Sequence, residues 1–283
     1  AEDGIRDVER SRGLGDVYKR QITDRPLDIN LREIKEVKKK WPDRAMIVSL
    51  MVPCNENSWK NILKKVEDTE ADGLELNFGC PHGMSERGMG AAVGQVPEYV
   101  KMVAEWCKQN TRMPVIVKLT PNITDITQPA KAAKDGGADA VSLINTISSV
   151  IGVDLDAMAP EPHTDGKGTH GGYCGPAVKP IALNMVGQIA RDINMQSFPI
   201  SGIGGITTWK DAAEFLSMGA GNVQVCTAAM TYGFKIIDEL TSGLSNWMDE
   251  KGYNNIDDFV AVSYTHLRAH ETSLHLVCRL LLE

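Results

Sequence analysis

The stretch VIVKLTPNITDITQPAKAAKDGGADAVSLI, residues 115–144, contains the pattern that decides the fold of this chain. A Val- and Ile-rich run (115–119) precedes an amphipathic stretch (125–135), a Gly-Gly pair and a second apolar run (140–144). Two β-type runs separated by a helical segment predict a β-α-β unit with parallel strands. Glycine after the helical stretch supplies the left-handed residue that commonly ends a helix.

The same alternation continues in both directions and predicts an α/β fold. Further strands are expected over residues 45–51, 74–78, 198–201 and 222–225, and further helices over 57–70, 97–110, 179–192, 208–218 and 228–250. The strands read as continuous apolar runs, as in a parallel sheet that is buried on both faces. Six such units without a G-x-G-x-x-G fingerprint predict a (β/α)8 TIM barrel and not a Rossmann sheet, although six units are two short of a complete barrel. The long stretch 145–178 is expected to be a functional loop or lid.

The composition excludes several classes of protein. The chain has 283 residues, 42% of them hydrophobic and 24% charged, and a net charge of −7, which argues against nucleic-acid or anionic-membrane partners. No run has the length of a transmembrane helix, and no signal peptide is visible. The six cysteines form no C-x-x-C pair, so we expect no metal site, iron–sulfur cluster or disulfide framework. Reduced thiols fit a cytoplasmic enzyme.

Both ends of the chain read as foreign to the fold. SRGLGDVYKRQ (11–21) and VSYTHLRAHE (262–271) can be encoded by the same DNA read on opposite strands, as can AEDGIRD (1–7) and HLVCRLL (275–281). These tails resemble translated sequencing adapters. We therefore set residues 1–21 and 262–283 aside, as one would a tag, and expect one partial barrel domain over residues 22–261.

Polar residues follow several of the expected strands, where parallel barrels carry their active sites. Asn77 and Asn145, with Asn122 as a weaker candidate, present amides that suit a ligand with alternating N–H and C=O groups, such as a pyrimidine. Capping of the following turns is the alternative role. Lys118 lies inside the apolar run VIVKL (115–119), so it is expected to point into the barrel mouth toward an anionic or electron-rich group, or else to extend past the strand end into solvent.

Glycines at neighbouring strand ends predict a phosphate site. Gly204 and Gly205 follow one expected strand, Cys226 and Thr227 follow the next, and Gly175 precedes a helix. Backbone N–H groups at consecutive loops of this kind bind phosphate in many barrels. The alternative is that each glycine only serves its own turn.

The loop NFGCPHG (77–83) places a thiol just after a strand. Cys80 in this position is a candidate general acid, whereas a buried cysteine is otherwise a small apolar filler. The second role is favoured for Cys54, Cys107 and Cys226. His82 is expected to contact substrate, to tune Cys80, or simply to be exposed.

Five segments of the chain resemble a known family. They are NFGCPHGMSERGMGAAVGQ, VIVKLTPNITDI, SLINTI, KGTHGGYCGPAVKPIAL and SGIGGITTWKDAAEFLSMGAGNVQVCTAAM. They look like the FMN-bearing subunits of bacterial NAD-dependent dihydropyrimidine dehydrogenases and, more broadly, like dihydroorotate dehydrogenase-type FMN barrels. The resemblance covers essentially all of residues 22–261, and the CPHG and GGYCG motifs are its specific parts.

The resemblance implies FMN as cofactor and uracil or thymine as substrate. The phosphate of FMN is expected to bind the backbone N–H groups of Gly175, Gly205 and Thr227, and Lys118 is expected to lie along the flavin. Asn77, Asn145 and Thr146 are implied to hydrogen-bond the pyrimidine ring. Cys80 is implied to protonate C5 of the ring while the flavin delivers hydride to C6. The first step of pyrimidine breakdown is the expected reaction.

The resemblance also implies partners outside this chain. In the family, further barrel strands precede the matching region, and a segment with two iron–sulfur clusters follows it. Electrons from NADH reach the FMN through a partner subunit that carries FAD, so a hetero-oligomer is expected. We expect this chain alone not to oxidise NADH and to bind FMN weakly. The alternatives are a dihydroorotate dehydrogenase and a non-catalytic FMN- or phosphate-binding barrel.

Overall fold

The fold is a six-stranded parallel sheet wrapped by helices, as seen in a computed structural model. The structure describes residues 25–81, 88–161 and 170–263, together with the backbone of three short strands, Asp16–Tyr18 (β1), His163–Thr164 (β9) and Lys167–Gly168 (β10). The parallel strands are β2 (Ile47–Leu50), β3 (Gly73–Asn77), β4 (Val115–Lys118), β5 (Ala140–Leu143), β12 (Ile200–Ile203) and β13 (Asn222–Gln224). They lie side by side in the order β13-β12-β5-β4-β3-β2.

This strand order distinguishes a barrel from a doubly wound sheet. Successive parallel strands of the chain are neighbours throughout, whereas a doubly wound sheet reverses its order at a switch point. Within the described residues the sheet does not close, because β2 and β13 are its two edges. The predicted α/β fold, an incomplete TIM barrel, is confirmed.

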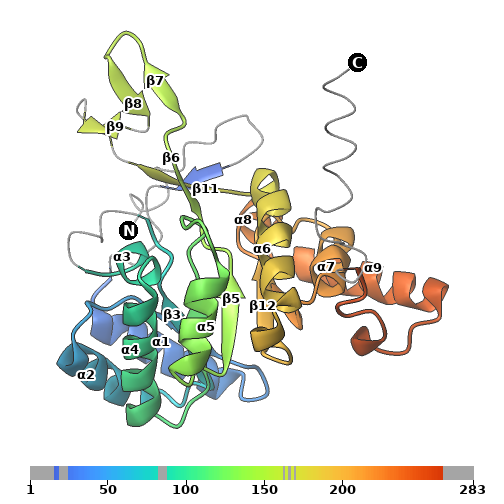
Figure 1. Cartoon of the computed structure of the whole chain (residues 1–283), viewed down its shortest axis with the longest axis horizontal. Coiled ribbons are helices and arrows are strands. Elements are labelled where there is room, and N and C mark those ends of the chain that lie inside the picture. Colours follow the sequence, from blue (N-terminus) through green and yellow to red (C-terminus); the bar gives the residue numbers. More distant parts are fainter. Residues whose placement is uncertain are drawn as a thin grey trace.

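The helices follow one another around the outside of the sheet. Figure 1 shows α2 (Glu56–Glu67), α4 (Pro97–Asn110), α5 (Thr127–Asp135), α6 (Lys179–Arg191) and α7 (Trp209–Ser217) from left to right in chain order. The other helical elements are α1 (Leu27–Lys40), α3 (Ala91–Gly94), α8 (Thr227–Tyr232), α9 (Ile236–Lys251) and the 3₁₀ turns η2 (Pro176–Val178), η3 (Ile193–Met195) and η4 (Ile256–Asp258). No helix in the described part of the chain is long and apolar enough to cross a membrane.

Local sequence explains where several helices begin and end. The side chain of Asn55 accepts the N–H of Ser58 and caps α2, and Pro97 begins α4 at the position where a missing N–H costs nothing. The prediction of one helix over 228–250 is wrong, because Gly233, with φ of 75°, separates α8 from α9. Helices α1 and α3 were not predicted from the sequence.

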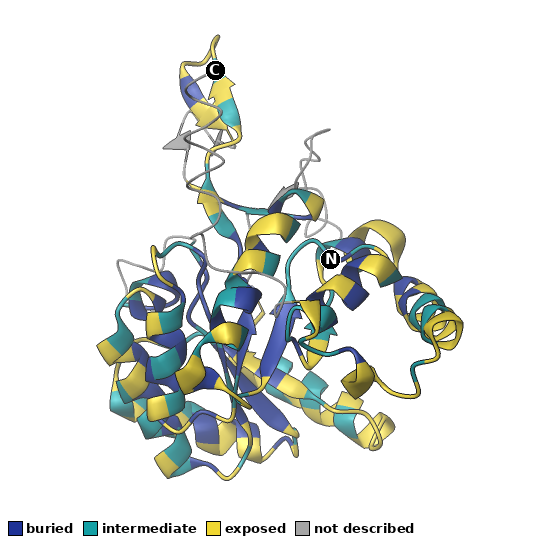
Figure 2. Cartoon of the chain, turned by 45° about the vertical axis from the view of Figure 1, so that its right-hand side comes forward, coloured by how far each residue is buried: buried dark blue, intermediate teal, exposed yellow. Residues whose placement is uncertain are grey.

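The two faces of the sheet differ in chemistry. On the face covered by helices, Leu74, Leu76, Val115, Val117, Val141 and Leu143 are all 0% exposed and belong to the core. The alternate residues face the inside of the arc, and they include Ser49, Lys118 and Gln224. The expectation of burial on both faces holds for Glu75 and Ser142 of the inner face, which are 7% and 0% exposed, but the expectation of continuous apolar strands is wrong there because this face carries polar and charged side chains. Figure 2 shows the strands in the buried colour and the helices buried along one side only.

The long stretch between β5 and α6 leaves the sheet and forms short antiparallel pairs. Strand β6 (Ile147–Ser149) pairs with β11 (Gly171–Cys174), and β7 (Gly152–Asp154) pairs with β8 (Ala159–Glu161) in a hairpin that projects away from the barrel (Figure 1). Strands β9 and β10 pair within the same excursion. The predicted loop over 145–178 thus has strands of its own.

Most of the two tails set aside in the sequence lies outside the described residues. The exception on the N-terminal side is β1, whose Val17 pairs with Tyr173 of β11 in antiparallel register. Val262 and Ser263 continue the chain on the other side, after η4. The domain limits at residues 22 and 261 stay a prediction.

Candidate functional site

A cavity of about 450 Å³ lies at the carboxyl ends of the parallel strands, a volume within the usual range for small-ligand sites. Its wall brings together nine of the residues predicted for the site: Asn77, Lys118, Asn145, Thr146, Gly175, Gly204, Gly205, Cys226 and Thr227. The inner-face side chains of Ser49, Glu75 and Gln224 also line it, and sequence reasoning did not single them out. The position of the cavity follows from the parallel sheet, since all strand ends meet at one rim.

Three of the predicted substrate ligands form one hydrogen-bonded group. Asn145 Nδ2 donates to Asn77 Oδ1 over 2.9 Å, and Asn145 Oδ1 accepts the backbone N–H of Thr146 over 2.7 Å. Gly79 makes this approach possible: its N–H donates to Asn77 Oδ1 over 3.2 Å, and a Cβ at residue 79 would overlap the Asn145 side chain. Both amide oxygens thus accept hydrogen bonds within the protein, so the remaining capacity of the pair to bind a ligand lies mainly in its amide N–H groups.

Asn122 has a supporting role instead. Its Nδ2 donates to the carbonyl of Thr146 over 3.1 Å, and its Oδ1 accepts the N–H of Ser148 over 2.8 Å. Asn122 does not line the cavity. This role differs from both roles expected from the sequence, because the amide neither lines the cavity nor caps its own following turn but holds the backbone that carries Thr146.

The floor of the cavity is a buried charged network. Lys118 Nζ lies 3.4 Å from Glu75 Oε1 across two adjacent strands, and their side chains are 16% and 10% exposed. Glu75 Oε2 accepts Ser142 Oγ over 2.9 Å and Gln224 Nε2 over 3.0 Å. Lys118 thus points into the barrel mouth as predicted, and a nearby anionic group is a carboxylate of the same chain. A charged residue within the apolar run LELNF was the signal for Glu75, the same signal that identified Lys118.

The glycines lie at the opposite end of the same row of strands. Gly175, Gly204 and Gly205 have φ of 85°, 140° and 75°, which only glycine adopts readily. A Cβ on Gly205 would lie 2.6 Å from the carbonyl oxygen of Gly175, so the two turns touch. Thr227 begins α8, where its N–H has no carbonyl partner one turn earlier in the helix, and its Oγ1 donates to Cys174 Sγ over 3.5 Å.

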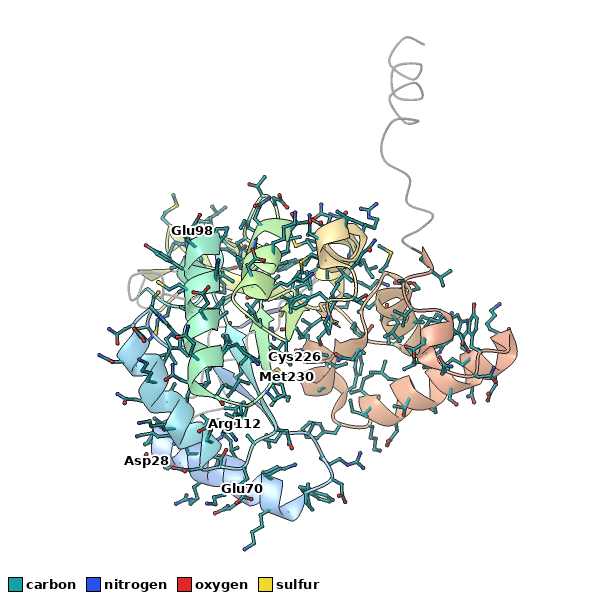
Figure 3. The ribbon with its side chains drawn as sticks, turned by 60° about the horizontal axis from the view of Figure 1, so that its bottom comes forward. Asp28, Glu70, Glu98, Arg112, Cys226 and Met230 are labelled. Atoms are coloured by element: carbon teal, nitrogen blue, oxygen red, sulfur yellow. The ribbon has the colours of Figure 1, made fainter. Side chains whose placement is uncertain are left out.

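Cys226 and Met230 line the edge of this end of the cavity. Figure 3 shows them next to one another, and the N–H of Met230 donates to the carbonyl of Cys226 over 3.2 Å. Cys226 is exposed, so the prediction that it is a packed thiol is wrong. That prediction holds for Cys107, which is 0% exposed in the core and whose burial raises its pKa to about 12.

Comparison with known proteins identifies the family. Residues 23–248 match the family model described as dihydroorotate dehydrogenase. The chain belongs to the dihydroorotate dehydrogenase family. Its fold also resembles the solved structure of a dihydroorotate dehydrogenase from Eimeria tenella in complex with ferulenol, with a TM-score of 0.67 over 84% of this chain and 68% of that one. The identity of 20% in that pair supports the fold alone.

Similar sequences carry two kinds of name. Dihydropyrimidine dehydrogenase (NADP(+)), chloroplastic, from Arabidopsis thaliana is 42% identical over 88% of this chain and 59% of its own length. NAD-dependent dihydropyrimidine dehydrogenase subunit PreA of Escherichia coli K12 is 40% identical over 87% and 60%. The catalytic subunit of dihydroorotate dehydrogenase B from Pyrococcus abyssi is 39% identical over 81% and 73%. The chain therefore spans about 60% of the dihydropyrimidine dehydrogenases it matches.

Cys80 is not among the described residues that line the cavity. Cys80 is 1% exposed, and its carbonyl accepts the N–H of Ala91 over 3.1 Å. A Cβ on Gly90 would lie 2.6 Å from that same carbonyl oxygen, so the backbone at residues 90 and 91 packs directly on Cys80. His82 lies outside the described residues. The roles of both residues stay predictions.

The cavity of this dihydroorotate dehydrogenase family member fits a phosphorylated ring cofactor. Along the parallel sheet, Asn77 ends β3, Lys118 ends β4, Asn145 follows β5, and Gly204 and Gly205 follow β12, whereas Gly175 follows β11 of the antiparallel sheet. Backbone N–H groups without side chains suit a phosphate, and an amine beside a ring suits negative charge that develops on it. The arrangement thus separates an anion-binding end from an amide-lined end.

Proposed function

We propose that this chain carries the FMN and pyrimidine sites of a dihydropyrimidine dehydrogenase and reduces the 5,6 double bond of uracil or thymine. The observation that carries the proposal is the hydrogen-bonded pair Asn77–Asn145 in the cavity wall. Neutral amides suit the neutral imide ring of these bases, whose carbonyl oxygens need N–H donors. The two relatives named dihydropyrimidine dehydrogenase, at 42% and 40% identity, support this choice.

Under this proposal the glycine turns hold the cofactor. The N–H groups of Gly175, Gly205 and Thr227 bind the phosphate of FMN, and the neighbouring Gly204 and Cys226 complete the two turns. Lys118 places its amine along the ring system, where a cation stabilises negative charge. When bound, the flavin supplies the hydride that the reaction requires.

The substrate ring lies against the amide end of the cavity. Asn77 Nδ2 donates to a ring carbonyl, and Asn145 is held in place by its contacts with Asn77 and the backbone of Thr146. Asn122 holds Thr146 in place by donating a hydrogen bond to the carbonyl oxygen of Thr146. Orientation of the ring thus depends on side chains that are already hydrogen-bonded before substrate arrives.

Cys80 supplies the proton in this proposal. Its Sγ–H gives a proton to C5 of the ring while C6 receives the hydride, and the resulting thiolate regains a proton from solvent. In the structure Cys80 is 1% exposed and outside the cavity wall. Proton transfer therefore requires the segment that carries Cys80 to rearrange when substrate binds, which fits a loop that closes over the site.

The test measures the pyrimidine half-reaction without a partner subunit. The FMN-loaded chain is reduced with dithionite without oxygen and then mixed with uracil, and reoxidation is followed by flavin absorbance. We expect reoxidation by uracil, and Cys80→Ser should slow it by roughly 100-fold or more with flavin still bound. Cys54→Ser is the matched control, since Cys54 is a half-buried thiol outside the cavity. Unchanged reoxidation in Cys80→Ser would exclude the proton-donor role.

A second candidate is oxidation of dihydroorotate. Lys118 supports it, because a cation in the cavity could pair with the carboxylate of that substrate, and the Pyrococcus relative at 39% identity carries that name. Reoxidation of the reduced chain by orotate and not by uracil would establish this reaction instead. Reoxidation by neither, with FMN bound, would favour the third possibility of a non-catalytic FMN-binding barrel.

The expected partners belong to the same proposal. A subunit carrying FAD and iron–sulfur clusters would pass electrons from NADH to the flavin, and the name of the Escherichia coli relative identifies that relative as a subunit. The assembly would be cytoplasmic. We expect the chain alone to reduce uracil only with an artificial electron donor.

A further inference from the structure

Asp211 lies immediately behind the predicted phosphate-binding turn and belongs to no role proposed above. It is 7% exposed and sits in the first turn of α7. Its Oδ2 accepts the N–H of Thr207 over 2.9 Å and the N–H of Thr208 over 2.8 Å. The hydroxyls of both threonines also donate to Oδ2, each over 3.0 Å. A single carboxylate oxygen of Asp211 thus accepts four hydrogen bonds from the end of the turn that begins with Gly204 and Gly205.

The other carboxylate oxygen joins a different part of the chain. Asp211 Oδ1 lies 2.6 Å from Nζ of Lys179, the first residue of α6, and this amine also lies 2.8 Å from Glu214 Oε2. Lys179 follows η2, which follows Gly175. The ion pair therefore connects the two turns whose glycines touch, since a Cβ on Gly205 would also lie 3.0 Å from Lys179 Cβ.

The contacts around Lys179 and Asp211 keep both side chains charged. Burial alone would raise the pKa of the Asp211 carboxyl, but Lys179 and the hydrogen bonds from Thr207 and Thr208 outweigh burial and lower that pKa to about 2. Burial also acts to lower the pKa of Lys179, and Asp211 and Glu214 reverse this and raise it. The pair is thus fully ionised at neutral pH. Without Lys179, a buried negative charge would remain beside a site that binds an anion.

We propose that Lys179 and Asp211 are positioning residues that clamp the Gly204–Gly205 turn against the Gly175 turn and so make the site select a phosphorylated flavin over the same flavin without phosphate. The clamp acts in two ways. It fixes the spacing between the backbone N–H groups of the two turns, and it neutralises the carboxylate behind them. Lys179 does not line the cavity, so it acts through Asp211 and the turns and not by touching the phosphate. The inference rests on the proposed FMN site.

The experiment compares FMN with riboflavin, which differ only in the phosphate. Dissociation constants are measured for the 283-residue chain by titrating flavin fluorescence, with no turnover required. In Lys179→Met, we expect FMN affinity to fall by about tenfold or more and riboflavin affinity to change by less than about threefold. A general loss of folding would weaken both ligands together.

A double variant tests whether the unpaired carboxylate causes the loss of FMN affinity. Lys179→Met combined with Asp211→Asn removes the unpaired carboxylate, so FMN affinity should recover partly toward that of the unaltered chain while remaining below it. If FMN affinity in the double variant were no better than in Lys179→Met alone, the carboxylate would not be what weakens FMN binding, and the clamp would be excluded.

The matched control is another lysine–aspartate pair that joins two elements. Lys131 Nζ of α5 lies 2.7 Å from Asp192 Oδ2, whose carboxylate caps η3, and neither residue lines the cavity. Lys131→Met should leave the ratio of the two dissociation constants unchanged. An equal change of that ratio in the control, or an unchanged ratio in Lys179→Met, would overturn the inference and leave the proposed function standing. An unaltered chain that does not prefer FMN over riboflavin would overturn both.

Discussion

The two faces of the parallel sheet are formed by the same strands, but one face packs against the helices and the other carries the polar groups of the candidate site. Leu76 and Val117 point toward the helices and are 0% exposed, whereas Glu75, Ile116 and Lys118, beside them in sequence, point into the arc. Burial of the first set supplies most of the apolar contact between sheet and helices. The second set places charges and amides where a ligand can reach them.

The difference shows how this fold separates stability from function. Charged groups are tolerated on the inner face because they are paired: Glu75 receives hydrogen bonds from Ser142 and Gln224 and faces Lys118. An unpaired buried charge would cost several kcal/mol, about as much as deleting a core side chain. The inner face therefore depends on mutual polar contacts, and the outer face depends on packing.

The largest loss of stability is expected when a buried side chain on the helix-covered face is truncated. Leu76→Ala should lower the free energy of unfolding by about 3 kcal/mol, because it removes a side chain with no exposed surface from the core. Ile116→Ala is the matched control on the inner face of the next strand, where the side chain is partly exposed, and should cost about 1 kcal/mol. Urea unfolding measures both. Equal costs would remove the distinction between the faces.

A smaller loss of stability is expected when the charged network on the inner face is broken. Glu75→Ala should cost about 2 kcal/mol, because Ser142 and Gln224 lose an acceptor and Lys118 loses its counter-ion. Glu75→Gln retains the shape and should cost about half as much. The measurement is again urea unfolding at neutral pH. A stable Glu75→Ala variant would show that the network does not support the inner face.

The smallest loss of stability is expected for a substitution at the edge of the inner face. Ser49→Ala on β2 should change the free energy of unfolding by less than about 0.5 kcal/mol, because Ser49 is exposed. Ser142→Ala, the same change at a site that is 0% exposed and bonded to Glu75, should cost about 1 kcal/mol. Thermal unfolding followed by circular dichroism resolves the two. A larger loss in Ser49→Ala than in Ser142→Ala would contradict the role given to pairing.

Sequence patterns were sufficient for elements with strong periodicity. Helix α4 spans Pro97–Asn110 as predicted, and all six parallel strands were expected within a few residues of their positions. The failures have local causes. Gly233 interrupts an apolar pattern that otherwise reads as one helix. Helix α1 carries Leu27, Leu31 and Ile34 at helical spacing, a signal that the prediction from sequence overlooked. The excursion after β5 folds through antiparallel pairing between segments that no local pattern connects.

The amino-acid sequence by itself determined which residues are polar at the strand ends and which segments form strands and helices, because both follow from short-range periodicity. Tertiary structure alone decided which polar groups meet. Asn77 bonds Asn145 across 68 residues, Gln224 bonds Glu75 across 149, and Lys179 bonds Asp211 across 32. These contacts depend on the register of parallel strands and on the close approach of two glycine turns, and neither leaves a mark in any single stretch of sequence.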